Sequence, residues 1–475
     1  MKYHVLKDHA LKHQTLQSVL ESVLKPELLQ SWLRIAAPFM LILPLAACGG
    51  GGGGGSTAAT TSPVSSPTSV NSAGTVLYSF GTNKNDGFTQ NNLIQGSDGN
   101  FYGEFLDEGN GGGGGAVFAV NATTHTETLP LSFGLAYSAG GESPEALLLG
   151  KDGNFYGVTS YGGSNNNDGV IFSMNPTTFA ETELYDFGAN SADVGNPLML
   201  IQGSDGNLYG LALALSKSII NTAAATVVAP VALFKYDMTS KTESVLNVFS
   251  ATLPVTPLSI TGGALLPQFA LVQASDGNLY GTMYTGGANN AGFLFGYNLT
   301  SNTATDLHDF GASSTDAAEP TGGLVEAANG ALYGVSLQGG QYGDGTIYSY
   351  NIGTPAESVV HSFNVADTGG SQPTSLIVGS NGQLYGATYS NQTIPGTSNL
   401  NSLGNVFVFN PATSAESVVY DFGSYNGNAS NGNNAPIGPM YILQGKDGNL
   451  YGMTKEGGVN GLGTVFEVPL SATTP

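Results

Sequence analysis

The chain has 475 residues and a formal net charge of −22; only 10% of its residues are charged, and 69 are glycine. This length allows two or three ordinary domains or one large β-architecture, and the composition favours short strands joined by turns over helices. The acidic balance excludes a nucleic-acid-binding protein, because contacts to phosphates need clustered lysine and arginine.

An apolar segment lies close to the N-terminus. The stretch "IAAPFMLILPLAA" at 35–47 is too short to span a bilayer and is typical of a signal-peptide core. It ends at Cys48, the only cysteine of the chain, so no internal disulfide can form. The letters "LAAC" at 45–48 resemble the lipobox of bacterial lipoproteins, which implies that Cys48 receives a lipid.

We therefore expect a signal peptide over 1–47 and a lipidated Cys48 that opens a Gly/Ser/Thr/Pro-rich tether over 48–74. This tether would hold a folded body beside a membrane. The expected location is the bacterial cell envelope, in the outer membrane or at the cell surface. The sequence leaves the side of the outer membrane open.

A seven-residue phrase then recurs seven times. Its copies, such as "SDGNLYG", occupy 97–103, 151–157, 204–210, 275–281, 328–334, 380–386 and 446–452. Their final glycines lie 54, 53, 71, 53, 52 and 66 residues apart. A period near 53 with two insertions indicates an internal repeat.

Each repeat contains four short apolar or alternating segments separated by turn residues, which predicts a four-stranded antiparallel meander. Seven such meanders predict an all-β, seven-bladed β-propeller over 75–470, followed by a tail over 471–475. The repeat region opens with a fourth-type strand at 75–80 and closes with a third-type strand at 463–470. We therefore expect strand 75–80 to complete the last blade and close the ring, which removes open sheet edges.

The acidic residue of the repeated phrase is expected to be structural. Asp-Gly and Asn-Gly pairs supply the positive-φ residues of primed hairpin turns. Asparagine at 329 and 381 replaces the aspartate in two copies. This exchange is compatible with a turn but not with a catalytic carboxylate. The structural turn residues are Asp98, Asp152, Asp205, Asp276 and Asp447.

These repeats resemble the GloVer (Gloeo/Verruco) tandem-repeat family of bacterial surface proteins, whose members carry different membrane anchors. The "SDGNLYG" copies, the glycine pairs that follow them (such as 286–287) and "GTVF" at 463–466 carry the resemblance over about 75–470. The resemblance implies a surface protein and transfers no catalytic residue.

The long loops mark a candidate binding face. Residues 211–230 and 388–403 extend loops between second and third strands, and 250–267 and 424–438 extend links between blades. All four lie on the face opposite the DGN turns, and long loops on a rigid scaffold often bind ligands. The candidate residues on this face are Asp107, Glu108, Asp168, Asp316, Glu319, Asp344 and Asp367, with a solvated acidic surface as the alternative interpretation.

Cofactors and catalysis have weak signals in this sequence. The stretch "NNNDG" at 165–169 suggests Ca²⁺ only weakly, because it lacks the spaced acidic residues of an EF-hand, and no other metal site is predicted. No nucleophile motif is found, and the blade-packing interpretation covers His308 and His361. We expect a non-enzymatic, monomeric module that binds a glycan or an envelope protein. A carbohydrate-active enzyme with paired carboxylates in the central funnel and a purely structural envelope protein are the alternatives.

Overall fold

A computed structural model provides the structure of the chain. It describes residues 74–83, 86–87, 92–106, 113–134, 142–165, 167–189, 193–214, 227–255, 269–364, 370–389, 403–423 and 436–470. The chain divides into two units, Met1–Ser65 and Ser66–Pro475, and every described residue belongs to the second. Within the described residues, no helix is long and apolar enough to cross a membrane.

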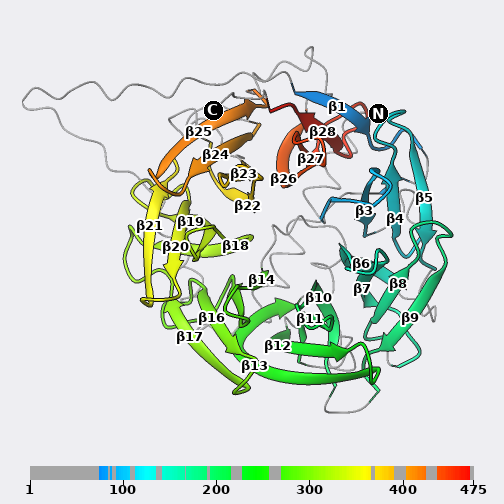
Figure 1. Cartoon of the computed structure of the whole chain (residues 1–475), viewed down its shortest axis with the longest axis horizontal. Coiled ribbons are helices and arrows are strands. Elements are labelled where there is room, and N and C mark those ends of the chain that lie inside the picture. Colours follow the sequence, from blue (N-terminus) through cyan, green and yellow to red (C-terminus); the bar gives the residue numbers. More distant parts are fainter. Residues whose placement is uncertain are drawn as a thin grey trace, which may run out of the picture. The chain divides into compact units, whose positions relative to one another are not determined.

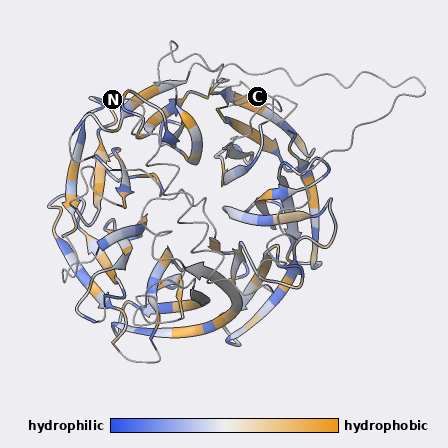
Figure 2. Cartoon of the chain, turned by 180° about the vertical axis from the view of Figure 1, so that it is seen from behind, coloured by the Kyte–Doolittle hydropathy of each residue, from blue (hydrophilic) through white to orange (hydrophobic). Residues whose placement is uncertain are grey.

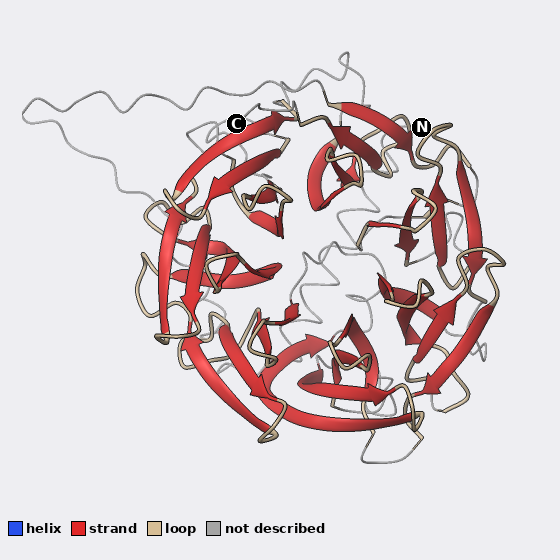
Figure 3. Cartoon of the chain, viewed as in Figure 1, coloured by secondary structure: helices blue, strands red, loops and turns tan. Residues whose placement is uncertain are grey.

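Seven four-stranded antiparallel sheets form a seven-bladed β-propeller, as the sequence predicts (Figures 1 and 3). Blade 1 contains β2 (Ile94–Gln95), β3 (Phe101–Phe105), β4 (Ala116–Val120) and β5 (Glu127–Ser132). Blade 2 contains β6 (Glu142–Leu149), β7 (Phe155–Tyr161), β8 (Val170–Met174) and β9 (Glu181–Asp186). Blade 3 contains β10 (Gly195–Gln202), β11 (Leu208–Leu213), β12 (Val227–Asp237) and β13 (Thr242–Val255).

The remaining blades repeat this order. Blade 4 contains β14 (Phe269–Gln273), β15 (Leu279–Met283), β16 (Phe293–Asn298) and β17 (Thr303–Asp309). Blade 5 contains β18 (Ala317–Glu326), β19 (Ala331–Gly339), β20 (Thr346–Asn351) and β21 (Ala356–Ser362). Blade 6 contains β22 (Pro373–Val378), β23 (Leu384–Thr388), β24 (Asn405–Asn410) and β25 (Ala415–Asp421). Blade 7 contains β26 (Ile437–Gln444), β27 (Leu450–Glu456), β28 (Thr464–Val468) and β1 (Thr75–Ser79).

The ring closes in blade 7, where strands from both ends of the repeat region pair. Strand β1 is the outer strand of this sheet and lies antiparallel to β28, with Val76 opposite Phe466 and Ser79 opposite Thr464. Phe80, which follows β1, is fully buried against Phe105 and Phe118 of blade 1. The N-terminal strand therefore completes the last blade, as expected.

The core lies between neighbouring blades and is built from the repeated phrase. Hydrophobic residues occur on the strands of all blades (Figure 2). Strands such as β4 and β11 are buried along their whole length, so both faces of these sheets bury side chains. The glycine of each "LYG" segment makes room for an aromatic ring of the third strand: a Cβ on Gly386 would lie 2.1 Å from the ring of Phe407. A larger residue at this glycine would push that ring out of place.

A proline-on-glycine contact joins consecutive blades at the loop face. Gly345 has a φ of +99°, and a Cβ there would lie 2.7 Å from Cδ of Pro373. Gln372, before that proline, has a φ of +56°, and its N–H donates to the carbonyl of Asp344 at 2.9 Å. Left-handed backbone is uncommon outside glycine, so the contact constrains both partners. Equivalent glycine–proline pairs are Gly115–Pro144, Gly169–Pro197, Gly292–Pro320 and Gly404–Pro439.

The DGN turns join the first and second strands, but the predicted primed turn is wrong. Gly96 N–H donates to the carbonyl of Asn100 at 2.9 Å and Gly99 N–H to that of Gly96 at 3.1 Å. Gly99 has a φ of +87°, whereas Asp98 is not among the described residues with positive φ. This is a type I turn followed by a left-handed glycine, a three-residue hairpin loop.

The aspartate of this turn holds a tyrosine of its own blade. Oδ2 of Asp98 accepts hydrogen bonds from Asn100 Nδ2 at 2.6 Å and from the hydroxyl of Tyr102 at 2.9 Å. Asp152, Asp205, Asp276 and Asp447 make the same contacts. In the two asparagine copies, Nδ2 of Asn329 and of Asn381 donates to the tyrosine hydroxyl instead. Either residue can therefore bridge the turn to the strand.

Candidate functional site

The residues of the predicted binding face have different environments. Cys48, Asp107, Glu108 and Asp367 lie outside the described residues. The other four are described but do not form one cluster: Asp168 and Asp344 belong to joints between blades, Asp316 lies at the outer strands, and Glu319 lies at the inner strands.

Asp168 is a structural residue and does not present its side chain to solvent. Its side chain is 0% exposed, and its carbonyl accepts a hydrogen bond from Asn196 N–H at 2.6 Å. The carbonyl of Asp344 accepts the equivalent hydrogen bond from the N–H of Gln372 at the joint between blades 5 and 6. The expectation that Asp168 lies on an accessible surface is not met, because the joint encloses it.

Glu319 lies in a polar cluster at the loop-face ends of the inner strands. It is the third residue of β18, the first strand of blade 5, and has a φ of +56°. Oε2 of Glu319 accepts hydrogen bonds from the hydroxyl of Tyr284 at 2.7 Å and from Nε2 of Gln338 at 2.8 Å. Burial, and then Glu319, raise the pKa of the Tyr284 phenol, which therefore remains a neutral donor. Tyr284 follows β15 of blade 4 and Gln338 lies near the end of β19 of blade 5, so two blades form this cluster.

A second aromatic group lies at the equivalent place in blades 6 and 7. The ring of Tyr389 follows β23, and Nζ of Lys455 lies 5.6 Å from its centroid, a cation–π distance. Burial lowers the pKa of Lys455, although the nearby Glu456 opposes this shift. Gly438 lies against the Tyr389 ring, since a Cβ there would be 2.3 Å from it. The tyrosine is half-buried.

A carboxyl pair lies on the inner strands of blades 1 and 2. Glu104 is 0% exposed and neither of its carboxyl oxygens has a hydrogen-bond partner among the described residues. Burial, and then Glu145, raise its pKa well above the usual range, which favours the protonated carboxyl. Glu145 is half-buried and is hydrogen-bonded to the hydroxyl of Ser160.

This carboxyl pair does not resemble the acid and base of a glycosidase. Those two groups must both touch the substrate, and Glu104 has no exposed surface. The equivalent positions of other blades hold Val158, Val335 and Met453, which are packing residues. The geometry therefore does not favour the enzymatic alternative.

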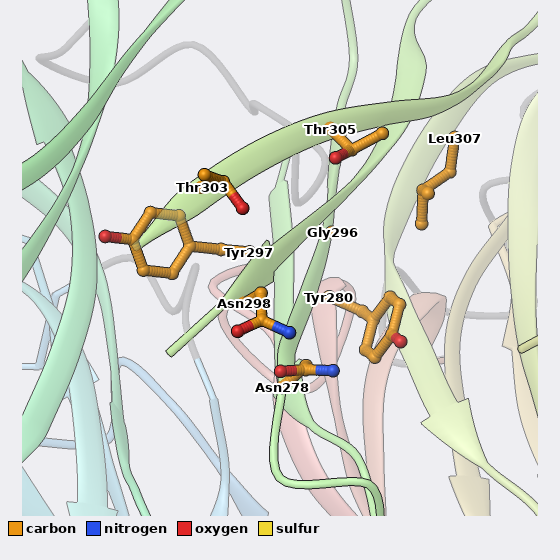
Figure 4. Close-up of a pocket in the computed structure, with 8 residues that line it drawn as sticks. All are labelled: Asn278, Tyr280, Gly296, Tyr297, Asn298, Thr303, Thr305 and Leu307. Atoms are coloured by element: carbon orange, nitrogen blue, oxygen red, sulfur yellow. The ribbon is translucent and has the colours of Figure 1, made fainter. Parts of the chain in front are cut away.

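A surface pocket of about 140 Å³ lies on blade 4, toward the DGN-turn face (Figure 4). Its lining residues are Asn278, Tyr280, Gly296, Tyr297, Asn298, Thr303, Thr305 and Leu307. Glu467 stands at the position of Gly296 in blade 7, where it accepts a hydrogen bond from Asn449 at 2.8 Å. The hollow is thus the space of one missing side chain, and we assign it no ligand.

The inner-strand tyrosines and Lys455 were missed by the sequence analysis, which concentrated on acidic loop residues. A signal for them exists in the third residue after the glycine of the repeated hydrophobic-Tyr-Gly segment. This residue is Ser160 or Leu337 in some blades and Tyr284, Tyr389 or Lys455 in others. Such variation marks a position that the repeat itself does not fix, although Ser160 and Leu337 are buried there. The contact between Tyr284 and Glu319 is not visible in sequence, because the residues belong to different repeats.

Comparisons with known proteins support the fold. The family model described as the Gloeobacter/Verrucomicrobia repeat matches residues 52–266 and 222–438. No curated protein matches the sequence. An oligogalacturonate lyase from Vibrio parahaemolyticus is similar in structure, with a TM-score of 0.51, 11% identity, and coverage of 86% of this chain and 99% of that one. At this identity the likeness shows the fold alone.

Two further structures are more distant. The extracellular domain of a hybrid two-component system from B. thetaiotaomicron has a TM-score of 0.49 and 12% identity over 85% of this chain, and the match spans 40% of that chain. A gluconolactonase from Xanthomonas campestris has a TM-score of 0.41 and 9% identity, with coverage of 84% of this chain and 89% of that one. This chain is similar to both structures in general outline.

Proposed function

This chain belongs to the Gloeobacter/Verrucomicrobia repeat family, and we propose that it is a lipid-anchored cell-envelope propeller that binds a polyhydroxyl ligand, such as a glycan, without transforming it. The proposed binding face is the loop face, centred on the inner-strand cluster of Tyr284, Glu319 and Gln338 and on Tyr389 beside Lys455. Cys48 is the proposed lipid attachment site.

The observation that supports binding is the chemistry of this cluster. Partly exposed tyrosine rings can stack on the apolar faces of sugars, while carboxylate and amide groups hydrogen-bond to sugar hydroxyls. The tyrosine hydroxyl and Gln338 already hold Glu319 in place, so the cluster is ordered before a ligand arrives. A pre-organised site loses less entropy on binding.

The observation that speaks against catalysis is the burial of Glu104, described above. A binding module needs no titrating carboxyl in contact with its ligand. The predicted long loops 211–230 and 388–403 have their central residues outside the described residues, and the ends of the first belong to strands β11 and β12. In this proposal they would add contacts to a larger ligand.

Binding is tested by thermal unfolding of the full-length chain against a glycan panel, followed by calorimetric titration of any hit. A ligand at 100 times its dissociation constant should add about 2.7 kcal/mol to the free energy of unfolding. Tyr284→Ala and Tyr389→Ala should each weaken binding at least about tenfold. The matched control is Phe179→Asn, which removes a 37% exposed aromatic side chain from a turn on the opposite face.

If both tyrosine variants bind a glycan as tightly as the natural chain does, the site lies elsewhere and this proposal is contradicted. The anchor is tested separately by labelling cells with a radioactive fatty acid. Label should enter the natural chain and be absent from Cys48→Ser, and equal labelling of both would exclude Cys48 as the attachment site.

A further inference from the structure

Three potential metal ligands meet where the outer strands of blades 4 and 5 face each other. Nε2 of His308, on β17, lies 3.6 Å from Oδ1 of Asp316 and 3.6 Å from Oε2 of Glu357. Asp316 belongs to the link between the blades and Glu357 to β21. All three ligand atoms lie within 4.8 Å of one another. We propose that this cluster binds a Zn²⁺ ion that fastens blade 4 to blade 5.

The spacing of the atoms fits a small ion better than it fits hydrogen bonds. A distance of 3.6 Å exceeds the usual length of a charge-assisted N–H···O contact. Zinc ligands lie about 2.0–2.2 Å from the metal, so two ligand atoms of a tetrahedral site are about 3.4 Å apart. An ion between the three atoms would need only small side-chain movements.

The burial of the ligands provides an independent observation. The side chain of Glu357 is 7% exposed, and that of Asp316 is 11% exposed. Oε1 of Glu357 and Nε2 of His308 are both buried atoms without a hydrogen-bond partner. A buried polar atom left unpaired is costly, and a bound cation would satisfy both.

The neighbouring contacts leave the ligand atoms available. The other carboxylate oxygen of Asp316, Oδ2, accepts a hydrogen bond from Ala312 N–H at 2.8 Å, which fixes the carboxylate. The His308 ring packs edge-on against Phe310, with centroids 4.9 Å apart. These contacts hold two of the three ligands in place without using their coordinating atoms.

The ligand set selects the type of metal. An imidazole nitrogen with two carboxylates suits Zn²⁺ and related first-row ions, whereas Ca²⁺ prefers six to eight oxygen ligands. The fourth tetrahedral position is left to water or to Oε1 of Glu357. The weak calcium signal at 165–169 lies in blade 2 and does not involve these residues.

Other junctions of the ring show what the histidine changes. In blades 7 and 2 the residues at the position of His308 are Tyr78 and Tyr185, and their hydroxyls donate to Asp86 at 3.1 Å and to Asp193 at 3.0 Å. Those junctions have Glu127 and Glu243 at the position of Glu357. Tyrosine closes the junction by a hydrogen bond, while His308 leaves a gap that can hold an ion.

The test uses the full-length chain after chelation and dialysis, titrated with Zn²⁺ by calorimetry. The natural chain should bind one more equivalent than His308→Tyr, and Zn²⁺ should raise the melting temperature of the natural chain only. Tyrosine fits the equivalent place in two other blades, so this variant should fold. His125→Asn, which removes an exposed histidine from a turn, controls for surface binding.

A second variant guards against misfolding of the first. Glu357→Gln keeps the side-chain volume and should weaken this Zn²⁺ equivalent at least about tenfold, because a charged ligand is lost. Co²⁺ bound to the natural chain should give the visible absorption of a four-coordinate ion, and His308→Tyr should lack it. Equal Zn²⁺ stoichiometry and equal Co²⁺ spectra in the natural chain and both variants would overturn the proposal.

Discussion

The junctions between blades 2 and 3 and between blades 4 and 5 have the same framework and different centres. Each contains an aspartate from the link and a glutamate from the next outer strand: Asp193 with Glu243 in one, and Asp316 with Glu357 in the other. Tyr185 stands at the centre of the first and His308 at the centre of the second. A single residue thus decides whether a carboxyl pair is held by a hydrogen bond or is available to a cation.

Both junctions bury a carboxyl pair, and burial raises the pKa of the glutamate in each. Burial, and then the nearby Asp193, raise the pKa of Glu243 to about 8. Burial, and then Asp193, also raise the pKa of Tyr185, so its hydroxyl remains protonated. The junction of blades 7 and 1 behaves alike, since burial and Asp86 raise the pKa of Glu127 to about 7.

The largest effect should come from removing the aspartate of the tyrosine junction. Asp193 accepts hydrogen bonds from the hydroxyl of Tyr185 at 3.0 Å and from the N–H groups of Ala189 at 3.1 Å and Val194 at 2.9 Å. Asp193→Ala should lower the free energy of unfolding by about 2–3 kcal/mol, because buried donors lose a charged acceptor. Urea unfolding measures this change.

Asp316→Ala is the matched change in the other junction. It removes one backbone hydrogen bond, from Ala312, and should cost less without metal. Equal losses in the two variants would contradict the distinction between the junctions.

The second effect is a dependence of stability on pH. Glu243 has a pKa of about 8 in the folded chain and a usual value of 4.5, so the folded state holds its proton more tightly than the unfolded state. Its contribution to stability is complete below pH 4.5 and is lost as the pH rises through 8. The melting temperature should therefore fall between pH 5 and pH 9.

Glu243→Gln provides the control, because glutamine cannot titrate. Its melting temperature should vary less across the same pH range than that of the natural chain. Superimposable pH profiles of the two proteins would show that Glu243 does not titrate in this window.

The third effect isolates the hydroxyl of the central tyrosine. Tyr185→Phe keeps the ring contacts with Phe187 and Tyr236 and removes the donor to Asp193. We expect a loss of about 1 kcal/mol, measured by chemical denaturation. A change near zero would mean that water replaces the hydroxyl without cost.

We expect the smallest change in stability from Tyr185→His, and we expect this variant to gain a metal site. This variant copies the histidine junction into blade 2, where Asp193 and Glu243 are already in place. It should bind one Zn²⁺ equivalent more than the natural chain by calorimetry. If no equivalent is gained while the variant remains folded, the geometry of the link matters more than the identity of the central residue.

The sequence predicts the propeller because its evidence is periodic. Each repeat carries the same four alternating segments, and the incomplete units at 75–80 and 463–470 complete each other, so blade number and closure follow from the sequence alone. The turn type was not predictable in the same way. The Asp-Gly pair fits both turn types, and the observed type I turn is accompanied by a hydrogen bond from the hydroxyl of Tyr102 to Asp98 in the same hairpin.

The candidate site was predicted less well, because composition does not say which polar loop residues satisfy the fold. Asp168 looks like an exposed loop acid but is enclosed at the joint with Asn196. Glu319 was identified, whereas its partner Tyr284 was not, since the two residues meet only when blades 4 and 5 pack. Contacts between blades are the part of this molecule that a single repeat cannot reveal.

The pairing of β1 with β28 also determines when the molecule can finish folding. A nascent chain has no partner for β1 until its last strand has been synthesised, so closure depends on contacts between residues very far apart in sequence, which form slowly. A chain truncated before Thr464 would leave the backbone of both β1 and β27 unpaired and open to other chains. Ring closure therefore requires the chain as far as Val468, because only then does β1 gain its partner and the open edge of β27 become covered.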